Sequence, residues 1–276
     1  MIIDMHTHIF PEKIAASSLA YMVNLLKAKL GKDAITPYTD GTMKGLLASM
    51  KRAGVDISVA LPVVTAPKQF ASINRFACMV NETPGLISFG GIHPDNEDPE
   101  ALLLQIKEMG LRGIKLHPDY QNCFVDDPRM VRIIKACVEL DLMVSIHAGF
   151  DPGLPDPIHC PPDRAVHMLD LVYGDTVPDH LHIILAHVGA QSMPEQVLAH
   201  LIGKPVYLDL SYAVGAMPEE LFLKIVRGHG VDRALFASDS PWDDPAKRIA
   251  YLKSLPFSKE ELEMIFWKNA AGFLPI

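Results

Sequence analysis

The sequence predicts an α/β protein, a single (β/α)8 TIM barrel domain spanning residues 1–276. Short apolar runs rich in Val, Ile and Leu recur along the chain and suit strands buried on both faces. Amphipathic stretches with helical periodicity separate these runs, and this alternation is typical of a parallel sheet closed into a barrel. No linker or internal repeat divides the chain. A doubly wound open sheet is the alternative architecture.

The predicted elements follow one another in a regular order. Asp127-Pro128 is a good cap and first-turn pair for one helix, and Ser258 with Glu261 forms a capping-box pattern at the start of the last. The predicted strands cover residues 1–5, 57–64, 86–92, 113–116, 142–146, 182–186, 205–210 and 234–237. The predicted helices cover residues 43–53, 67–82, 99–109, 128–140, 164–173, 192–202, 218–228, 245–254 and 258–271.

Two connections depart from this regular pattern. Residues 10–42 form an insertion after the first strand, in which a helix is expected over residues 12–30. Residues 149–163 form a proline-rich loop after the fifth strand. Because long loops in compact domains are often lids or binding loops, both segments are expected to lie near a functional site.

Composition excludes several classes of partner. The net charge is −8, and no basic stripe of the kind that binds nucleic acid is present. The sequence shows no signal peptide and no membrane span, and the four cysteines form no CxxC pair. We therefore expect a cytoplasmic protein that acts on a small molecule, without nucleic acid or membrane partners. A homo-oligomer is expected only by analogy with other barrels.

Polar side chains gather at the carboxyl ends of the predicted strands. In a barrel these ends converge on one face, where active sites are built. The chain has twelve histidines. Those at or just past strand ends are His6, His8, His93, His117, His147 and His187, and Asp239 holds the matching place on the eighth strand.

This arrangement predicts a metal site. His6 and His8 are two residues apart on an extended chain, so their side chains point the same way. With His147 and Asp239 they offer imidazole and carboxylate ligands, which suit zinc and also divalent iron, cobalt or manganese. A bound cation can lower the pKa of its water from about 16 to about 7. Asp239 could take the proton of the attacking water, and His187 could polarise the carbonyl under attack.

Four motifs follow the strands in order from the first strand to the last: IDMHTH at 3–8, SIHAG at 145–149, LAHVG at 185–189 and FASDSPW at 236–242. Together they resemble the amidohydrolase superfamily of metal-dependent barrels. The last motif is similar to the branch that also contains nonoxidative decarboxylases of aromatic and unsaturated carboxylic acids. The resemblance implies that His6, His8, His147 and Asp239 are ligands of one divalent metal, with zinc as the first expectation.

The resemblance leaves the roles of two residues open. His187 is either a catalytic acid or electrophile, or the ligand of a second metal. Lys115 lies near the place where binuclear relatives carry a carboxylated, bridging lysine. In the mostly mononuclear branch it would instead be a positive charge facing a substrate carboxylate. One metal is favoured, and a binuclear site is the alternative.

Four further residues near strand ends are candidate substrate contacts. His93 and His117 are each followed by proline, and each could touch substrate or bond its own loop backbone. Phe10 and Trp242 could line a pocket for a flat substrate, although plain packing is the favoured interpretation for each of them.

Two reactions fit these residues. The first is hydrolysis, in which metal-activated water attacks an amide, ester or lactone carbonyl of a small molecule. The second is nonoxidative decarboxylation of a small aromatic or unsaturated carboxylic acid by a lyase that uses the same metal. The sequence alone favours the hydrolase as the broader class. A metal-binding barrel without catalysis is a third reading, but the acid/base residues that it would have lost are all present.

Overall fold

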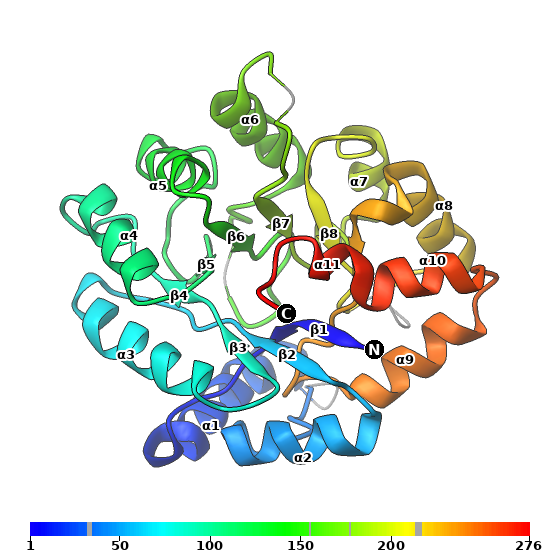
Figure 1. Ribbon diagram of the computed structural model, residues 1–276, viewed down its shortest axis with the longest axis horizontal. Coiled ribbons are helices and arrows are strands. Elements are labelled where there is room, and N and C mark those ends of the chain that lie inside the picture. The colour runs from blue at the N-terminus through cyan, green and yellow to red at the C-terminus, as the bar shows by residue number, and fades with distance from the viewer. Residues whose placement is uncertain (32–34, 155, 177, 213–216) are drawn as a thin grey trace.

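A computed structural model describes residues 1–31, 35–154, 156–176, 178–212 and 217–276. Short parallel strands form an inner ring, and the helices surround it (Figure 1). The predicted (β/α)8 barrel is therefore confirmed. The strand bounds are β1 (Ile3–Thr7), β2 (Ile57–Ala60), β3 (Leu86–Ser88), β4 (Gly90–Gly91), β5 (Gly113–Leu116), β6 (Met143–Ile146), β7 (Ile183–Leu185), β8 (Tyr207–Asp209) and β9 (Ala234–Leu235).

The strands pair in two runs, β1-β2-β3 and β4 through β9, and all pairs are parallel. β3 and β4 are the two halves of the predicted strand at 86–92, interrupted at Phe89, whose N–H still donates to Ala60 O at 3.0 Å. The ring closes between β9 and β1, because Met5 N donates to Phe236 O at 2.9 Å and Asp239 N to His6 O at 2.8 Å. A parallel bridge between Thr7 and Ser240 continues this closure.

The helices agree with the predicted ones to within a few residues at most ends. Residues 67–69 form a 3-10 turn before α3, and the last predicted helix is divided by a π-helical turn at Met264–Lys268. No helix of the described residues is long and apolar enough to cross a membrane. The helices are α1 (Glu12–Leu30), α2 (Met43–Ala53), α3 (Phe70–Asn81), α4 (Pro99–Glu108), α5 (Pro128–Glu139), α6 (Pro162–Tyr173), α7 (Pro194–His200), α8 (Glu219–His229), α9 (Pro245–Ser254), α10 (Lys259–Glu263) and α11 (Asn269–Ala271).

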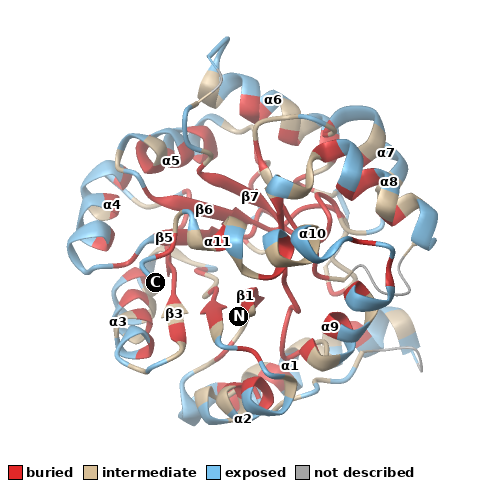
Figure 2. Ribbon diagram, turned by 45° about the vertical axis from the view of Figure 1, so that its right-hand side comes forward, coloured by how far each residue is buried: buried red, intermediate tan, exposed pale blue. Residues whose placement is uncertain are grey.

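Buried residues fill the ring and the inner faces of the helices (Figure 2), and most of them are apolar. One cluster lies between strands and helices, and a smaller one joins side chains of the strands to the C-terminal segment. The smaller cluster includes Ile3, Met5 and Phe89, which pack with Ala270 and Leu274. The C-terminus lies over the centre of the ring in Figure 1. The amino-terminal half of the barrel is thus closed by apolar residues, which leaves the carboxyl end for polar groups.

The β1 strand changes its register between Asp4 and Thr7. Ile3 and Met5 belong to the inner apolar cluster, yet past the shift it is His6 that contacts the other polar groups at the carboxyl end. Asp4 bonds Ser238 through both carboxylate oxygens, and this contact joins β1 to the segment after β9. A β-bulge of this kind re-aims a side chain next to a functional site.

Both irregular connections lie at the carboxyl end. The predicted helix of the insertion is confirmed as α1, and residues 32–34 fall outside the described part of the chain. The proline-rich loop follows β6, and of its residues 155 is likewise not described. Lys29 of α1 donates to the Leu154 carbonyl of this loop, so the two segments meet.

Candidate metal centre

A pocket of about 680 Å³ opens at the carboxyl end of the barrel. Its floor is polar and comes from strand ends, whereas α1 and α3 form much of its wall. The predicted site residues that line it are His6, His8, Lys115, His117, His147, His187, Asp239, Phe10 and Trp242.

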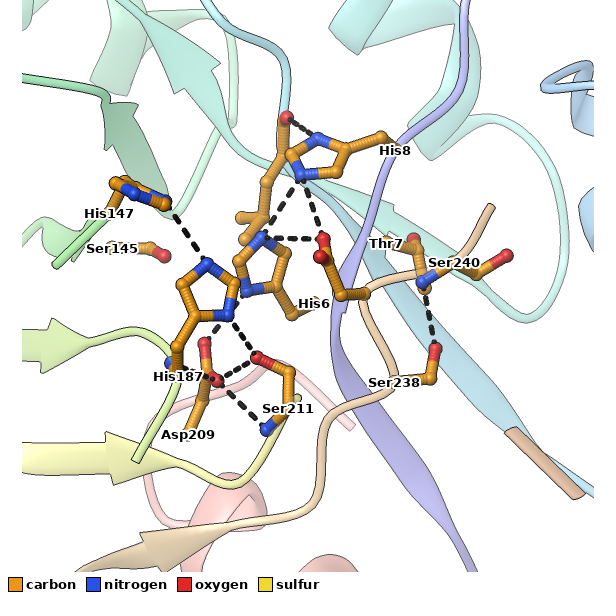
Figure 3. A network of polar contacts seen from close by, with 12 residues as sticks. His6, Thr7, His8, Ser145, His147, His187, Asp209, Ser211, Ser238 and Ser240 are labelled. Atoms are coloured by element: carbon orange, nitrogen blue, oxygen red, sulfur yellow. Dashed lines mark hydrogen bonds and ion pairs between the residues drawn. The ribbon is translucent and has the colours of Figure 1, made fainter. Parts of the chain in front are cut away.

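His6 and His8 turn the same ring nitrogen toward one point (Figure 3). His8 Nδ1 lies 2.8 Å from Leu61 O, and His6 Nδ1 lies 2.8 Å from Asp209 Oδ2. Since both oxygens only accept hydrogen bonds, each Nδ1 carries the proton and each Nε2 presents a lone pair. The two Nε2 atoms lie 3.0 Å apart. Two lone pairs at that distance repel each other unless a cation or proton lies between them.

Asp239 completes this group of donors. Its Oδ1 lies 3.5 Å from His6 Nε2 and 3.3 Å from His8 Nε2. Ligand atoms around a tetrahedral zinc, with bonds near 2.0–2.1 Å, are separated by about 3.3 Å. The two imidazoles and the carboxylate therefore fit a divalent cation in both chemistry and spacing.

Three residues that line the pocket, Tyr212 and the predicted site residues His187 and Asp239, hold unusual backbone conformations. His187 has φ 60° and Asp239 has φ 63°, in the left-handed region that side chains with a Cβ seldom adopt. Hydrogen bonds hold both peptides, because His187 N donates to Asp209 Oδ1 at 3.0 Å and Asp239 N donates to His6 O at 2.8 Å. Such conformations cluster at functional sites, where the surrounding structure over-determines them.

A chain of hydrogen bonds orients His187. Ser211 Oγ donates to Asp209 Oδ1 at 2.5 Å and lies 2.8 Å from His187 Nδ1, so His187 Nδ1–H donates to Ser211. His187 Nε2 then accepts from His147 Nδ1–H at 3.0 Å. This leaves the buried Nε2 of His147 without a hydrogen-bond partner among the described residues. His187 also stacks on His6 at 5.2 Å between ring centroids, which joins this chain to the first group.

A second group of possible ligands surrounds His147. His117 stacks on it at 4.1 Å, and Asp151 Oδ2 lies 3.4 Å from His117 Nε2. However, His117 Nδ1 accepts from Tyr120 N at 3.3 Å, which puts the proton of neutral His117 on Nε2. This nitrogen is therefore a hydrogen-bond donor rather than a metal ligand. The first group is the better candidate for a cation site.

Burial controls the charges of the floor. It lowers the pKa values of His6, His117, His147 and His187 well below the usual value, so their rings are neutral. Neutral imidazole is the form that binds metals.

Burial also shifts the pKa values of Lys115 and Asp239, the two charged residues of the floor. It lowers the pKa of Lys115 to about 8, although Asp209 and Asp239 oppose this shift. Burial raises the pKa of Asp239. Lys115 Nζ lies 3.4 Å from His6 Nε2 and 3.4 Å from Ser145 Oγ, and no carboxylate of the described residues lies within ion-pair distance of it.

Comparison with known proteins places the chain in a family. The model of the family described as Amidohydrolase matches residues 3–276. The chain belongs to the amidohydrolase family. No curated protein matches its sequence.

Solved structures share the fold of this amidohydrolase-family chain. The 5-carboxyvanillate decarboxylase of Sphingomonas paucimobilis matches with a TM-score of 0.71 and 18% identity, covering 100% of this chain and 99% of the other. A 2,6-dihydroxybenzoate decarboxylase from Rhizobium matches with a TM-score of 0.68 and 15% identity over 99% and 98%. A 5-carboxyvanillate decarboxylase of Novosphingobium aromaticivorans, complexed with manganese and 4-hydroxy-3-methoxy-5-nitrobenzoic acid, matches with 0.72 and 19% over 99% and 95%.

One predicted substrate contact is placed elsewhere in this family member. His93 is not among the described residues that line the pocket. Its Nδ1 accepts from Asp95 N at 3.1 Å, and its N–H donates to Asn96 Oδ1 at 3.0 Å, so it serves its own loop. The structure therefore favours the structural role for His93, while His117, Phe10 and Trp242 do line the pocket.

The sequence analysis missed Asp209 and Ser211. Asp209 is 1% exposed and accepts from His6 Nδ1, His187 N, Ser211 N and Ser211 Oγ. The sequence position of Asp209 could have identified it, because Asp209 is the last residue of β8 and lies at a strand end like the other floor residues. Carboxylates that accept from a metal-binding histidine fix its tautomer and orientation.

Proposed function

We propose that the chain is a metal-dependent nonoxidative decarboxylase of a small aromatic or unsaturated carboxylic acid. Lys115 is the observation that carries this proposal. It is a buried cation beside the candidate metal ligands with no ion-pair partner among the described residues. With a pKa of about 8 it is mostly protonated at neutral pH. A buried unpaired charge is costly, and the carboxylate of a bound substrate would neutralise it.

His6, His8 and Asp239 would hold the metal. His147 lies outside this group, and its ring would have to turn for the unpaired Nε2 to join them. The bound ion would polarise the substrate carboxylate and an oxygen next to it. Manganese and zinc both suit this donor set. The decarboxylase of Novosphingobium aromaticivorans was solved with manganese. For the metal of this chain, manganese is therefore as well supported as zinc.

The residues of the floor supply the remaining chemistry. Lys115 binds and orients the substrate carboxylate. Burial raises the pKa of Asp239, and its carboxyl oxygen that does not bind the metal would carry the proton to the ring carbon as carbon dioxide leaves. His187, whose Nδ1–H donates to Ser211, would accept a hydrogen bond at Nε2 from a substrate hydroxyl next to the reacting carbon once His147 turns toward the metal. Asp239 then recovers a proton from solvent through the open pocket.

Hydrolysis, which the sequence alone favoured, is the competing outcome. The family assignment is compatible with both reactions, whereas the decarboxylases among the similar structures support the lyase better. Product analysis separates the two. The manganese-loaded and zinc-loaded protein should release carbon dioxide from hydroxybenzoates such as 2,6-dihydroxybenzoate. Release of acid from lactones, esters or amides, with no carbon dioxide from any acid tested, would contradict the proposal.

Lys115→Met tests the carrying observation. We expect the KM for the active acid to rise about 10- to 100-fold, the value of a lost charge-assisted hydrogen bond, with metal content unchanged.

We also propose one metal per chain rather than two. Two equivalents in protein purified without chelators would overturn that count and give Lys115 the bridging role instead.

A further inference from the structure

We propose that the substrate is amphiphilic, with its acid group on the polar floor and an apolar body against the wall formed by α1 and α3. This inference rests on the proposed function and names its substrate class: an aromatic acid with an extended apolar substituent remote from the carboxylate. Three features of the pocket support it: the two-faced helix α1, the apolar side chains opposite it, and the distribution of charge.

α1 has one face packed on the protein and another that borders the pocket. Ala15 and Leu19 are buried on the first. Ile14, Ser18, Met22 and Leu26, spaced four residues apart, line the pocket, and all of them except Ser18 are apolar. Ile14 is 48% exposed, and the neighbouring Tyr21 is 62% exposed. The exposed side chains of Ile14 and Tyr21 therefore border the open part of the pocket.

α3 and the loop before it continue the wall. Ile73 and Phe76 of α3 line the same pocket as α1, together with Pro62 and Val63 from the segment after β2. All of these are only partly buried, although they are apolar. A ligand that covers them removes apolar surface from water, which favours binding by roughly 25 cal/mol for each Å².

Charged side chains are confined to the floor and to Asp151 of the proline-rich loop. Among the described lining residues, the acidic and basic side chains are Lys115, Asp151, Asp239 and the histidines. The wall adds hydroxyl and amide groups, such as Ser18 and Gln69, but no arginine and no glutamate. A second anionic group on the substrate would therefore meet no counter-charge there. The remote part of the substrate must be neutral.

The size of the pocket agrees with this reasoning. Its volume of about 680 Å³ lies well within the range of sites that enclose a drug-sized ligand. A single ring with one carboxylate bound on the floor would leave much of this volume unfilled. An apolar extension would fill the remaining space.

Binding of 4-alkylbenzoates tests the proposal. These probes carry the acid group but lack the ring hydroxyl, so binding can be measured without turnover. Benzoate, 4-propylbenzoate and 4-hexylbenzoate would be titrated calorimetrically into the manganese-loaded protein. We expect the affinity to rise about three- to fourfold for each methylene that reaches the wall, and to be at least about 50-fold higher for the hexyl probe than for benzoate.

Three variants locate the effect. Ile73→Ser makes the wall polar and should reduce the hexyl gain about tenfold while benzoate binds as before. Ser18→Trp fills the wall and should exclude the hexyl probe but not benzoate. Met79→Ser is the matched control for Ile73→Ser, because Met79 also lies on α3, is 56% exposed and is not among the described residues that line the pocket. It should leave all three affinities unchanged.

An affinity that does not depend on chain length, or a hexyl gain that survives both wall variants, would overturn the inference. In that case the exposed face of α1 is covered by something else, such as a second copy of the chain. Failure of the proposed function is distinct: the hexyl gain would persist, but carbon dioxide would be released from no acid, with or without an alkyl group.

Discussion

The floor and the wall of the pocket are built on opposite principles. On the floor, polar side chains from different strands are almost fully buried, and most of their nitrogens and oxygens bond a specific partner. On the wall, Ile14 and Tyr21 of one helix are 48% and 62% exposed and border the pocket. The hydrogen bonds of the floor fix the positions of individual atoms, whereas the wall provides apolar surface for a ligand to cover.

This difference teaches where the protein tolerates change. A buried hydrogen-bonded network loses more than one contact when a member is removed, because the partners are left unpaired. A partly exposed apolar surface loses only the area that is removed. Substitutions on the floor should therefore have large effects on chemistry and metal content, and substitutions on the wall small effects that depend on the ligand.

The largest effect is expected for the metal donors. The ligand atoms of His6, His8 and Asp239 lie 3.0–3.5 Å apart. His6→Ala removes one of these atoms, and Asp239→Asn replaces the carboxylate by a neutral amide, which binds cations more weakly. Since a bound cation contributes several kcal/mol to catalysis, activity should fall about 10³-fold or more. Metal analysis of the purified variants should show less bound metal. Unchanged metal content in both variants would mean that the site lies elsewhere.

His187→Asn should separate chemistry from metal binding. Activity should fall about 10²- to 10⁴-fold, as is usual for the loss of an acid/base or oxyanion-stabilising group. Metal content should stay close to that of the unaltered protein, because His187 is not part of the group formed by His6, His8 and Asp239. A parallel loss of metal would instead indicate a second ion bound by His187.

A more moderate effect is expected for Asp209→Asn. This change removes the carboxylate that bonds His6 Nδ1, and loss of such a partner typically weakens metal affinity about 10- to 100-fold. Competition with a coloured chelator would measure it. Asp141→Asn is the matched control, because Asp141 also bonds a histidine, His182, at 2.9 Å, but its side chain is 85% exposed. Equal effects of the two changes would contradict the special role of Asp209.

The smallest effect is expected on the wall. Phe76→Ala removes part of the apolar surface from α3. The KM of a substrate with an apolar substituent should rise several-fold, while kcat, metal content and the KM of an unsubstituted acid stay nearly constant. A loss of kcat as large as that expected for His187→Asn would contradict the claim that wall residues contribute to substrate binding and not to the chemical step.

The same difference explains what the sequence could predict. Strand ends of a parallel barrel converge, so the location of His6, His8, His147, His187 and Asp239 on one face followed from strand positions alone. Asp209 occupies an equivalent place and was overlooked because it does not stand in a histidine motif. His93 also follows a strand end, but its ring accepts a hydrogen bond from its own loop. The sequence does not distinguish this structural role from a substrate contact.

The wall was beyond sequence analysis for a physical reason. The pattern of α1 predicted a helix over residues 12–30, and the structure confirms it. Which of its faces packs and which borders the pocket depends on where α3 and the proline-rich loop lie. Residues such as Ile14 and Met22 look like core residues in sequence, because nothing local distinguishes a face covered by protein from one that is left open.

Anomalous diffraction from crystals of the manganese-loaded protein tests the central claim most directly. We expect one ion, bound by Nε2 of His6, Nε2 of His8 and a carboxylate oxygen of Asp239, with His147 turned to join them. Lys115 should lie beside the ion without a bond to it. An ion held instead by His117, His147 and Asp151, or a second ion bridged by Lys115, would contradict this account of the floor.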